Sequence, residues 1–317
     1  MKIAIIGSGA MGSLVGAKIS DNSEVLLFDH WTSHVDEINS NGLKLISNNE
    51  EIVYKNLRAS SNYNDLKGYD IYLILVKGTN TNKELEILKD IVSDSSLVIT
   101  LQNGLGNHDV IANYIKKDNI AYGMMDFNAR LVKEALVDYN ISTRKISLTM
   151  YQDNNDNKLF KEFNKILKQS GFIVEVNNAK KDIWQKLIIN ANFNAVSGIT
   201  GLKIGKLIND ENFDKIIRGI TSEIVEITNK KNINLNLEDE INNVYERSKT
   251  AMEHYPSLAQ DASRRLKTEI DYLNGAIIKE GIKEGVLTPY NNTVYSLFKI
   301  IENNYEDGKL FNINNKK

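Results

Sequence analysis

The chain has 317 residues, of which 42% are hydrophobic and 25% charged, a length and composition that predict a globular protein of two domains. Its 39 basic and 41 acidic residues leave a formal net charge of −2, so there is no basic excess to bind nucleic acid. The absence of cysteine excludes disulfides, thiolate nucleophiles and cysteine-bound metals. No apolar run approaches the ~18 residues that span a bilayer, and the first apolar run is too short for a signal peptide. We expect a soluble, cytoplasmic protein with no membrane partner.

The first 178 residues alternate short apolar runs with amphipathic stretches. Runs at 3–6, 25–28, 71–76 and 97–101 are continuous rather than alternating, which is typical of strands buried on both faces. A helix over 10–20 joins the first two, and repetition of this βαβ pattern predicts a parallel, doubly wound sheet. Further strands are expected at 121–125, 136–139, 145–149 and 172–176.

From about residue 180 the pattern becomes helical. Pro289 fits a helix start and Gly285 a helix stop. The sequence therefore predicts an α/β fold in two domains, a Rossmann-type dinucleotide-binding domain over 1–178 and an all-helical domain over 179–317. The helices are expected at 181–197, 211–231, 238–253, 257–283 and 290–305, before a polar, frayed end.

A glycine-rich turn follows the first strand and opens the first helix. Gly7 permits the tight turn, Gly9 lets a pyrophosphate approach the backbone, and Gly12 permits close packing of helix on strand. The free N–H groups of the helix then face the phosphates. Asp29 lies 17 residues past Gly12, at the end of the second strand, as this fingerprint requires. The alternatives are a plain strand–helix turn and a methyltransferase loop. The predicted cofactor site comprises Gly7, Ser8, Gly9, Ala10, Met11, Gly12 and Asp29.

Two further positions follow strands, where this fold places its ligands. Lys77 follows the run at 71–76, and Asn103 with Gly104 follows the run at 97–101. The alternatives are a solvated lysine and a tight Asn-Gly turn.

A stripe of polar residues marks the first predicted helix of the second domain. Lys186, Asn190 and Asn194 are spaced by four, so successive members are offset by only about 40°. Their neighbours are apolar, which predicts a mostly buried helix. A lysine facing a cleft can protonate a carbonyl oxygen as hydride arrives, and adjacent amides can orient the substrate. The spacing leaves open a lysine that extends into solvent.

One hydroxyl position and one acidic position stand out later in the chain. Pro256 interrupts the helical pattern, and Ser257 is a predicted N-cap for the next helix. Glu269 is expected on a helix among apolar neighbours, where a surface acid is the alternative. Of the four histidines only His30 and His34 have metal-ligand spacing, and that pair lacks carboxylate support, so no metal site is expected.

Together these motifs resemble those of the ketopantoate reductase (2-dehydropantoate 2-reductase) family. The resemblance runs from about residue 1 to 300 and rests on five blocks, of which the third and the last are specific. It implies a dinucleotide-binding domain and a helical domain with the active site in the cleft between them. The blocks, in order, are GSGAMG (7–12), LQNGLG (101–106), IWQKLIINANFN (183–194), HYPSLAQD (254–261) and KTEIDYLNGA (267–276).

The resemblance also implies roles for single residues. Lys186 would be the general acid, and Glu269 a carboxylate that holds the substrate and the lysine. Asn190, Asn194 and Ser257 would bind the substrate. Asn103 and Lys77 would lie near the nicotinamide, with Asn103 also reaching the substrate.

The chain departs from the family at three places. Ala195 stands where proline is frequent, and Leu258 replaces the methionine of a Pro-Ser-Met variant. At the end of the second strand, NADPH-dependent members usually carry an arginine, whereas this chain has Asp29. An aspartate there accepts a hydrogen bond from a ribose 2′-hydroxyl and repels a phosphate. NADPH is the family default, but Asp29 favours NADH, as in the D-mandelate dehydrogenases of the same family.

We therefore expect a nicotinamide-dependent reductase acting on a small 2-oxo acid. The first choice is reduction of 2-dehydropantoate to pantoate in pantothenate biosynthesis. An NAD-dependent D-2-hydroxyacid dehydrogenase would share the same catalytic residues. A non-catalytic dinucleotide-binding sensor would require the loss of Lys186 or Glu269, and both are present. The sequence leaves open whether the chain forms a homodimer.

Overall fold

The computed structural model describes residues 1–48, 50–140 and 143–305. By its contacts the chain divides into two compact units. The first comprises Met1–Gln102 and Asn107–Lys180. The second begins at Lys181 and includes the short segment Asn103–Gly106, so the chain enters the second unit briefly, returns to the first, and enters the second again.

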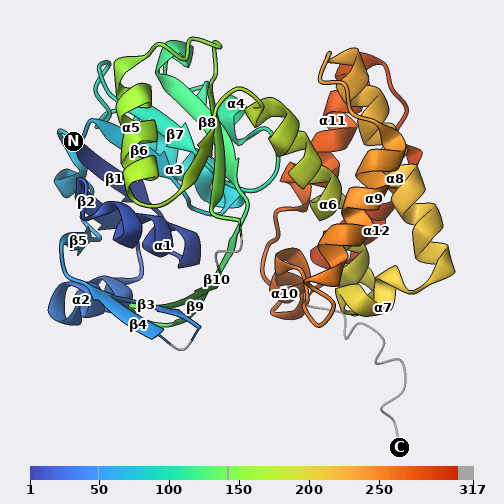
Figure 1. Ribbon diagram of the computed structural model, residues 1–317, viewed down its shortest axis with the longest axis horizontal. Coiled ribbons are helices and arrows are strands. Elements are labelled where there is room, and N and C mark those ends of the chain that lie inside the picture. Colours follow the sequence, from blue (N-terminus) through green and yellow to red (C-terminus); the bar gives the residue numbers. More distant parts are fainter. Residues whose placement is uncertain (49, 141–142, 306–317) are drawn as a thin grey trace, which may run out of the picture. The chain divides into compact units, whose positions relative to one another are not determined.

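The first unit is built on an eight-stranded sheet (Figure 1). All neighbouring strands are parallel except one antiparallel pair near the edge. The chain builds outward from the first strand in both directions, so the topological switch point lies beside that strand. This arrangement confirms the predicted doubly wound sheet. The order is β12 (Ile173–Glu175), β11 (Lys145–Met150), β8 (Ile120–Met125), β7 (Leu97–Thr100), β6 (Ile71–Ile74), β1 (Lys2–Ile6), β2 (Glu24–Phe28) and β5 (Leu57–Ser60), with β11 antiparallel to β8.

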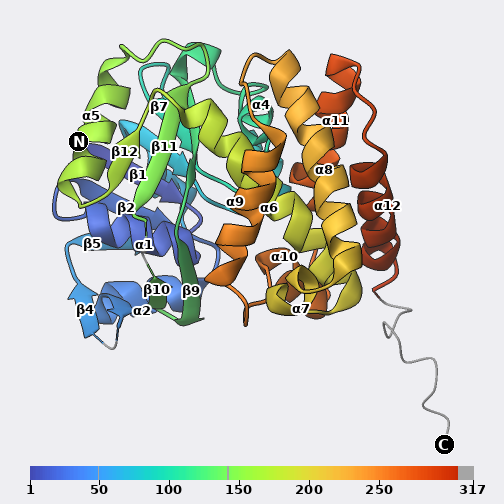
Figure 2. The same ribbon diagram turned by 45° about the vertical axis from the view of Figure 1, so that its right-hand side comes forward.

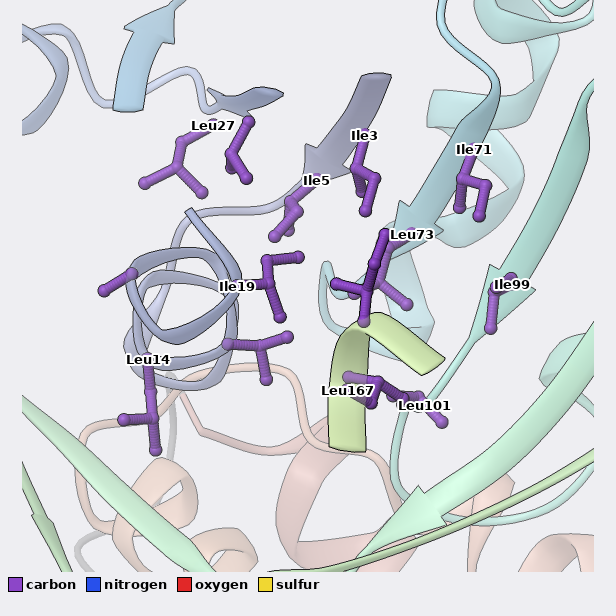
Figure 3. Packing of buried hydrophobic residues seen from close by; sticks show 14 of the residues in the cluster. Ile3, Ile5, Leu14, Ile19, Leu27, Ile71, Leu73, Ile99, Leu101 and Leu167 are labelled. Atoms are coloured by element: carbon purple, nitrogen blue, oxygen red, sulfur yellow. The ribbon is translucent and has the colours of Figure 1, made fainter. Parts of the chain in front are cut away.

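Both faces of this sheet are covered by helices, which explains the continuous apolar runs. Ile3 and Ile5 of β1 pack in the same cluster as residues of α1 (Ala10–Ile19) and α5 (Lys158–Gln169), as Figure 3 shows. Ala4 and Ile6, which point to the opposite face, pack with residues of α3 (Thr81–Leu88) and α4 (Asn107–Ile111). The core therefore has two layers, one on each side of the strands.

A second, four-stranded sheet lies against α1. Seven of the ten residues of α1 are buried, because the helix contacts β1 and β2 on one side and this second sheet on the other. The predicted strand at 136–139 is confirmed, but it belongs to this sheet rather than to the large one. The order is β4 (Glu50–Tyr54), β3 (Leu43–Ser47), β10 (Leu136–Asn140) and β9 (Asn128–Lys133). The unit is completed by α2 (Thr32–Asn41), which contacts β5, and by the 3-10 helices η1 (Tyr63–Leu66), η2 (Gly78–Asn80) and η3 (Lys117–Asn119).

All regular secondary structure in the described residues of the second unit is helical. Its helices confirm the predictions at 181–197, 211–231, 238–253 and 290–305 to within a few residues. Gly285, at φ +66°, ends one helix in the left-handed conformation, and Pro289 is the first residue of the next. The helices are α6 (Ala179–Thr200), α7 (Ile204–Ile208), α8 (Glu211–Lys230), α9 (Leu237–Lys249), α10 (Ser257–Ser263), η4 (Ile270–Tyr272), α11 (Asn274–Glu284) and α12 (Pro289–Asn303).

The prediction of a single helix over 257–283 is wrong. The chain forms α10, leaves the helix through Arg265 at φ +57°, and re-enters it at α11. Ser257 is not the N-cap of α10: Pro256 holds that position, and its carbonyl accepts the first intrahelical bond, from the Gln260 N–H at 3.0 Å. In the part of the chain that the structure describes, no helix has the length and apolar character needed to cross a membrane.

Candidate active site

The glycine loop has the geometry of a phosphate-binding turn. Gly7 has φ +98°, and a Cβ there would lie 2.6 Å from the Val76 nitrogen. A Cβ on Gly12 would lie 2.0 Å from the Gly7 oxygen. Gly9 differs, since it is exposed and a Cβ there would meet no atom within 4 Å. The start of α1, whose first N–H groups have no intrahelical acceptor, is therefore open beside Gly9, as the predicted pyrophosphate site requires.

Asp29 is bound directly to this loop. Its Oδ2 accepts hydrogen bonds from the Ser8 N–H at 2.8 Å and the Ser8 hydroxyl at 3.2 Å. Its Oδ1 accepts a bond from the Trp31 N–H at 3.1 Å. A carboxylate can accept about four hydrogen bonds, and Asp29 is half-buried. It thus retains capacity for a ribose hydroxyl, while its charge opposes a phosphate at the same place.

A buried histidine that the sequence did not single out supports the same loop. The His34 Nδ1 accepts the Ala135 N–H at 3.0 Å, so the neutral ring carries its proton on Nε2. That nitrogen lies 3.4 Å from the Ser13 hydroxyl, which donates to the Ser8 carbonyl at 2.7 Å. Burial lowers the pKa of His34, which keeps the ring neutral. No sequence signal distinguished His34, because its partner Ala135 is remote in the chain.

This histidine predicts a pH-dependent stability. A histidine whose pKa is lower in the folded state than the unfolded value of about 6.5 takes up a proton on unfolding. Its contribution to stability is therefore complete above that value and declines as the pH falls toward the folded pKa. We expect Tm to fall less steeply between pH 7 and pH 5 in His34→Gln than in the wild type. The exposed His254→Gln should keep the wild-type slope, and equal slopes for all three proteins would contradict the assignment.

A second polar cluster that the sequence did not predict follows β2. The His30 Nε2 lies 2.9 Å from Glu84 Oε1, and the Tyr63 hydroxyl donates to Glu84 Oε2 at 2.8 Å. Glu84 belongs to α3 and is only 3% exposed. Lys77 follows β6, is exposed, and is the N-cap of η2.

The second unit holds the predicted catalytic lysine. The Lys186 ammonium, on α6, donates to the Asn103 Oδ1 at 2.8 Å, and both residues are half-buried. Asn103 is held by its own loop, where the Leu105 N–H donates to the Tyr272 carbonyl at 2.8 Å. Gly104 has φ +84°, and a Cβ there would lie 2.2 Å from the Tyr272 oxygen. Only glycine therefore lets this loop approach closely enough to place Asn103 beside the lysine.

The two asparagines of the stripe differ in their surroundings. Asn194 is 4% exposed; its Nδ2 donates to the Asn190 carbonyl at 3.1 Å, and its Oδ1 accepts the Leu258 N–H at 3.1 Å. It thus ties α6 to the first turn of α10, beside the exposed Ser257. Asn190 is half-buried. The mostly buried helix predicted from the sequence is confirmed.

Glu269 is half-buried and lies in the turn before η4 rather than on a helix as predicted. Its neighbours Thr268 and Ile270 are fully buried, so the chain on both sides of the carboxylate is anchored. Within the described ranges, no group of three or more His, Asp or Glu side chains is placed to hold a metal ion.

Comparisons with known proteins cover nearly the whole chain. Residues 3–151 match the family model described as ketopantoate reductase PanE/ApbA, and residues 178–302 match the model of its C-terminal domain. A 2-dehydropantoate 2-reductase of Streptococcus pyogenes serotype M6 is 30% identical over 299 residues, which are 94% of this chain and 96% of the relative. One from Archaeoglobus fulgidus is 27% identical and covers 95% of this chain and 98% of its own length.

Solved structures also resemble nearly the whole chain. The ternary structure of D-mandelate dehydrogenase with NADH and anilino(oxo)acetate is 28% identical, with a TM-score of 0.87 over 96% of this chain and 99% of that one. A PanE/ApbA family ketopantoate reductase from Ralstonia eutropha JMP134 is 27% identical, with a TM-score of 0.86 over 96% of this chain and 100% of that one.

Proposed function

Because the chain belongs to the ketopantoate reductase family, we propose that it reduces 2-dehydropantoate to pantoate. Membership makes it an oxidoreductase that uses a nicotinamide cofactor and a small keto acid. The overall reaction converts the 2-oxo acid, NAD(P)H and a proton into the 2-hydroxy acid and NAD(P)⁺. The observation that carries the proposal is the Lys186–Asn103 hydrogen bond of 2.8 Å.

The cofactor, when bound by the glycine loop and Asp29, supplies the hydride. As hydride reaches the ketone carbon, negative charge grows on the ketone oxygen, and a general acid must neutralise it. Lys186 donates that proton. The neutral amide of Asn103 orients the ammonium without competing for the proton. Glu269 holds the substrate and the lysine, while Asn190, Asn194 and Ser257 bind the remaining polar groups of the substrate.

An NADH-dependent D-2-hydroxyacid dehydrogenase is the second candidate. Asp29 supports it, because its Oδ2 is held at the glycine loop by the Ser8 N–H and a 2′-phosphate there would meet its charge. The likeness to a D-mandelate dehydrogenase solved with NADH also supports it. Both candidates require the same proton donor, so they differ only in the side chain of the substrate and in the cofactor.

Steady-state kinetics with 2-dehydropantoate and phenylglyoxylate, each with NADH and with NADPH, test the proposal. A higher kcat/KM for 2-dehydropantoate supports the first candidate, and a higher value for phenylglyoxylate replaces it with the second. Activity with neither acid, while NADH still binds, would overturn both and leave a dinucleotide-binding sensor.

Asp29 is expected to set a preference for NADH over NADPH. Asp29→Ala should lower the ratio of kcat/KM for NADH to that for NADPH by about 10-fold or more, because a hydrogen bond to a charged group contributes about 1.5–3 kcal/mol. Adding His30→Arg should move the ratio further toward NADPH. The exposed Asp36→Ala, on α2, should leave the ratio unchanged. A wild-type kcat/KM that is higher with NADPH would refute this electrostatic argument and point to Lys77 or another lysine as the phosphate partner.

A further inference from the structure

α12 anchors the segment that carries Glu269 on the N-terminal side of that residue. The Thr268 N–H and hydroxyl both donate to one oxygen of Glu302, at 2.8 and 2.7 Å. Thr268 is fully buried and the Glu302 side chain is only 7% exposed. A charged acceptor that is buried and doubly bonded fixes the backbone strongly. The residue immediately before Glu269 is therefore fixed to α12.

The same helix anchors the segment on the C-terminal side of Glu269. The Tyr295 hydroxyl donates to Asp271 Oδ1 at 2.7 Å, and the Lys299 ammonium lies 3.4 Å from Asp271 Oδ2 and 2.6 Å from Glu302 Oε2. Burial, with the hydrogen bond to Asp271, raises the pKa of Tyr295 to about 12, so the hydroxyl remains a donor at neutral pH. Positions 295, 299 and 302 follow the i, i+4, i+7 spacing of one helix face, which we name the α12 stripe.

The α12 stripe rests on a well-packed helix. α12 packs along α11 and α8 (Figure 2), and Phe298 within it is fully buried. The anchored segment also holds the loop of Asn103, since the Tyr272 carbonyl accepts a hydrogen bond from the Leu105 N–H. One face of α12 thus fixes the turn that carries Glu269. The same turn contacts the loop of Asn103, which is the hydrogen-bond partner of Lys186.

We propose that Tyr295, Lys299 and Glu302 are positioning residues for the reaction, which hold Glu269 and the loop of Asn103 in the geometry that catalysis requires. This inference rests on the proposed function of the same site. The stripe does not itself touch the reacting atoms; it acts through Thr268 and Asp271. Its loss should therefore impair turnover without weakening cofactor binding.

Tyr295→Phe tests the proposal with the smallest change, since it removes one hydroxyl. Tyr245→Phe is a matched control: the Tyr245 hydroxyl also donates to an aspartate, Asp214, at 2.7 Å, and its pKa is likewise raised to about 12. This hydrogen bond joins α9 to α8 rather than α12 to the turn of Glu269. Tyr295→Phe should lower kcat by roughly 3- to 30-fold, the scale on which slight misplacement of a reacting group acts. Tyr245→Phe should keep kcat and KM within about 2-fold of the wild type, and NADH affinity by fluorescence titration should be unchanged in both.

Glu302 provides the rescue experiment. Glu302→Gln keeps an oxygen that can accept from Thr268, whereas Glu302→Leu removes it. We expect Glu302→Gln to retain more of the wild-type kcat than Glu302→Leu, at comparable Tm. Should the leucine variant fail to fold, Tyr295→Phe alone decides.

Glu269→Ala separates failure of this inference from failure of the proposed function. A Glu269→Ala protein with normal kcat removes the carboxylate from the mechanism, and with it the proposed site. A Glu269→Ala protein that is inactive, together with Tyr295→Phe and Tyr245→Phe proteins of equal kcat and KM, leaves the site intact and overturns the positioning role of the α12 stripe.

Discussion

Replacing Lys186 with alanine is expected to lower kcat by at least ~10²-fold, the low end of the contribution of a positioned general acid. The reduction of a ketone concentrates charge on its oxygen, and we propose the Lys186 ammonium, which donates to Asn103 at 2.8 Å, as the proton donor. Because the nucleotide loop lies in the first unit, NADH binding measured by nicotinamide fluorescence should survive the substitution.

Lys206→Ala provides the control for charge alone, since Lys206 is an exposed lysine of the same unit, on α7. It should leave kcat unchanged. Lys186→Ala and Glu269→Ala should combine less than additively if the two residues act as the proposed catalytic pair, since either change then disables the same unit. A Lys186→Ala enzyme with near-normal kcat would remove the lysine from the mechanism.

Gly9→Val should abolish most of the cofactor affinity while leaving the fold intact. Gly9 has φ −62° and ψ −166°, an extended conformation that valine adopts readily, and its Cβ would meet no atom within 4 Å. The added side chain would occupy the space in which we expect the pyrophosphate to reach the start of α1. We expect the Kd for NADH to rise by about 100-fold or more, as when several hydrogen bonds to a charged group are lost, with Tm within a few degrees of the wild type.

Gly12→Ala is the contrasting variant within the same loop. Its Cβ would lie 2.0 Å from the Gly7 oxygen, so it should lower Tm markedly by displacing α1 from β1. Gly9→Ala should fall between the wild type and Gly9→Val in NADH affinity. Unchanged NADH affinity in Gly9→Val would mean that the cofactor does not approach this loop.

Much of the fold was predictable because local patterns determine it. The central strands of the large sheet are buried on both faces, so their apolar runs were visible in the sequence, and Gly7, Gly9 and Gly12 marked the turn between β1 and α1. Of the four-stranded sheet only β10 was predicted. Strands β4 and β9 are exposed along most of their length, which leaves little hydrophobic pattern to read.

The helix predicted over 257–283 failed for a different reason. The helical spacing of its apolar residues continues through the break between α10 and α11. The interactions that fix this break come from α12, about thirty residues later in the chain. Thr268 cannot be identified from its neighbours as the partner of Glu302, because a hydrogen bond across the fold leaves no local pattern. The hydrogen bond between Lys186 and Asn103 was likewise not predicted: the resemblance implied a role for each residue but not their pairing, and 83 positions separate the two. The roles assigned to both residues stay predictions.

The brief passage of the chain through the second unit at Asn103–Gly106 makes that unit a discontinuous folding unit. A fragment starting at Lys181 would contain every helix of the unit, yet the Tyr272 carbonyl would lack the Leu105 N–H and the Lys186 ammonium would lack the Asn103 oxygen. During synthesis Asn103–Gly106 leaves the ribosome long before Tyr272 is made. The hydrogen bond between Leu105 and Tyr272 can therefore form only when nearly the whole chain has been synthesised. Excision at the unit boundary, or circular permutation that opens the chain between Gln102 and Asn107, would therefore disassemble the arrangement around the lysine without removing a single helix.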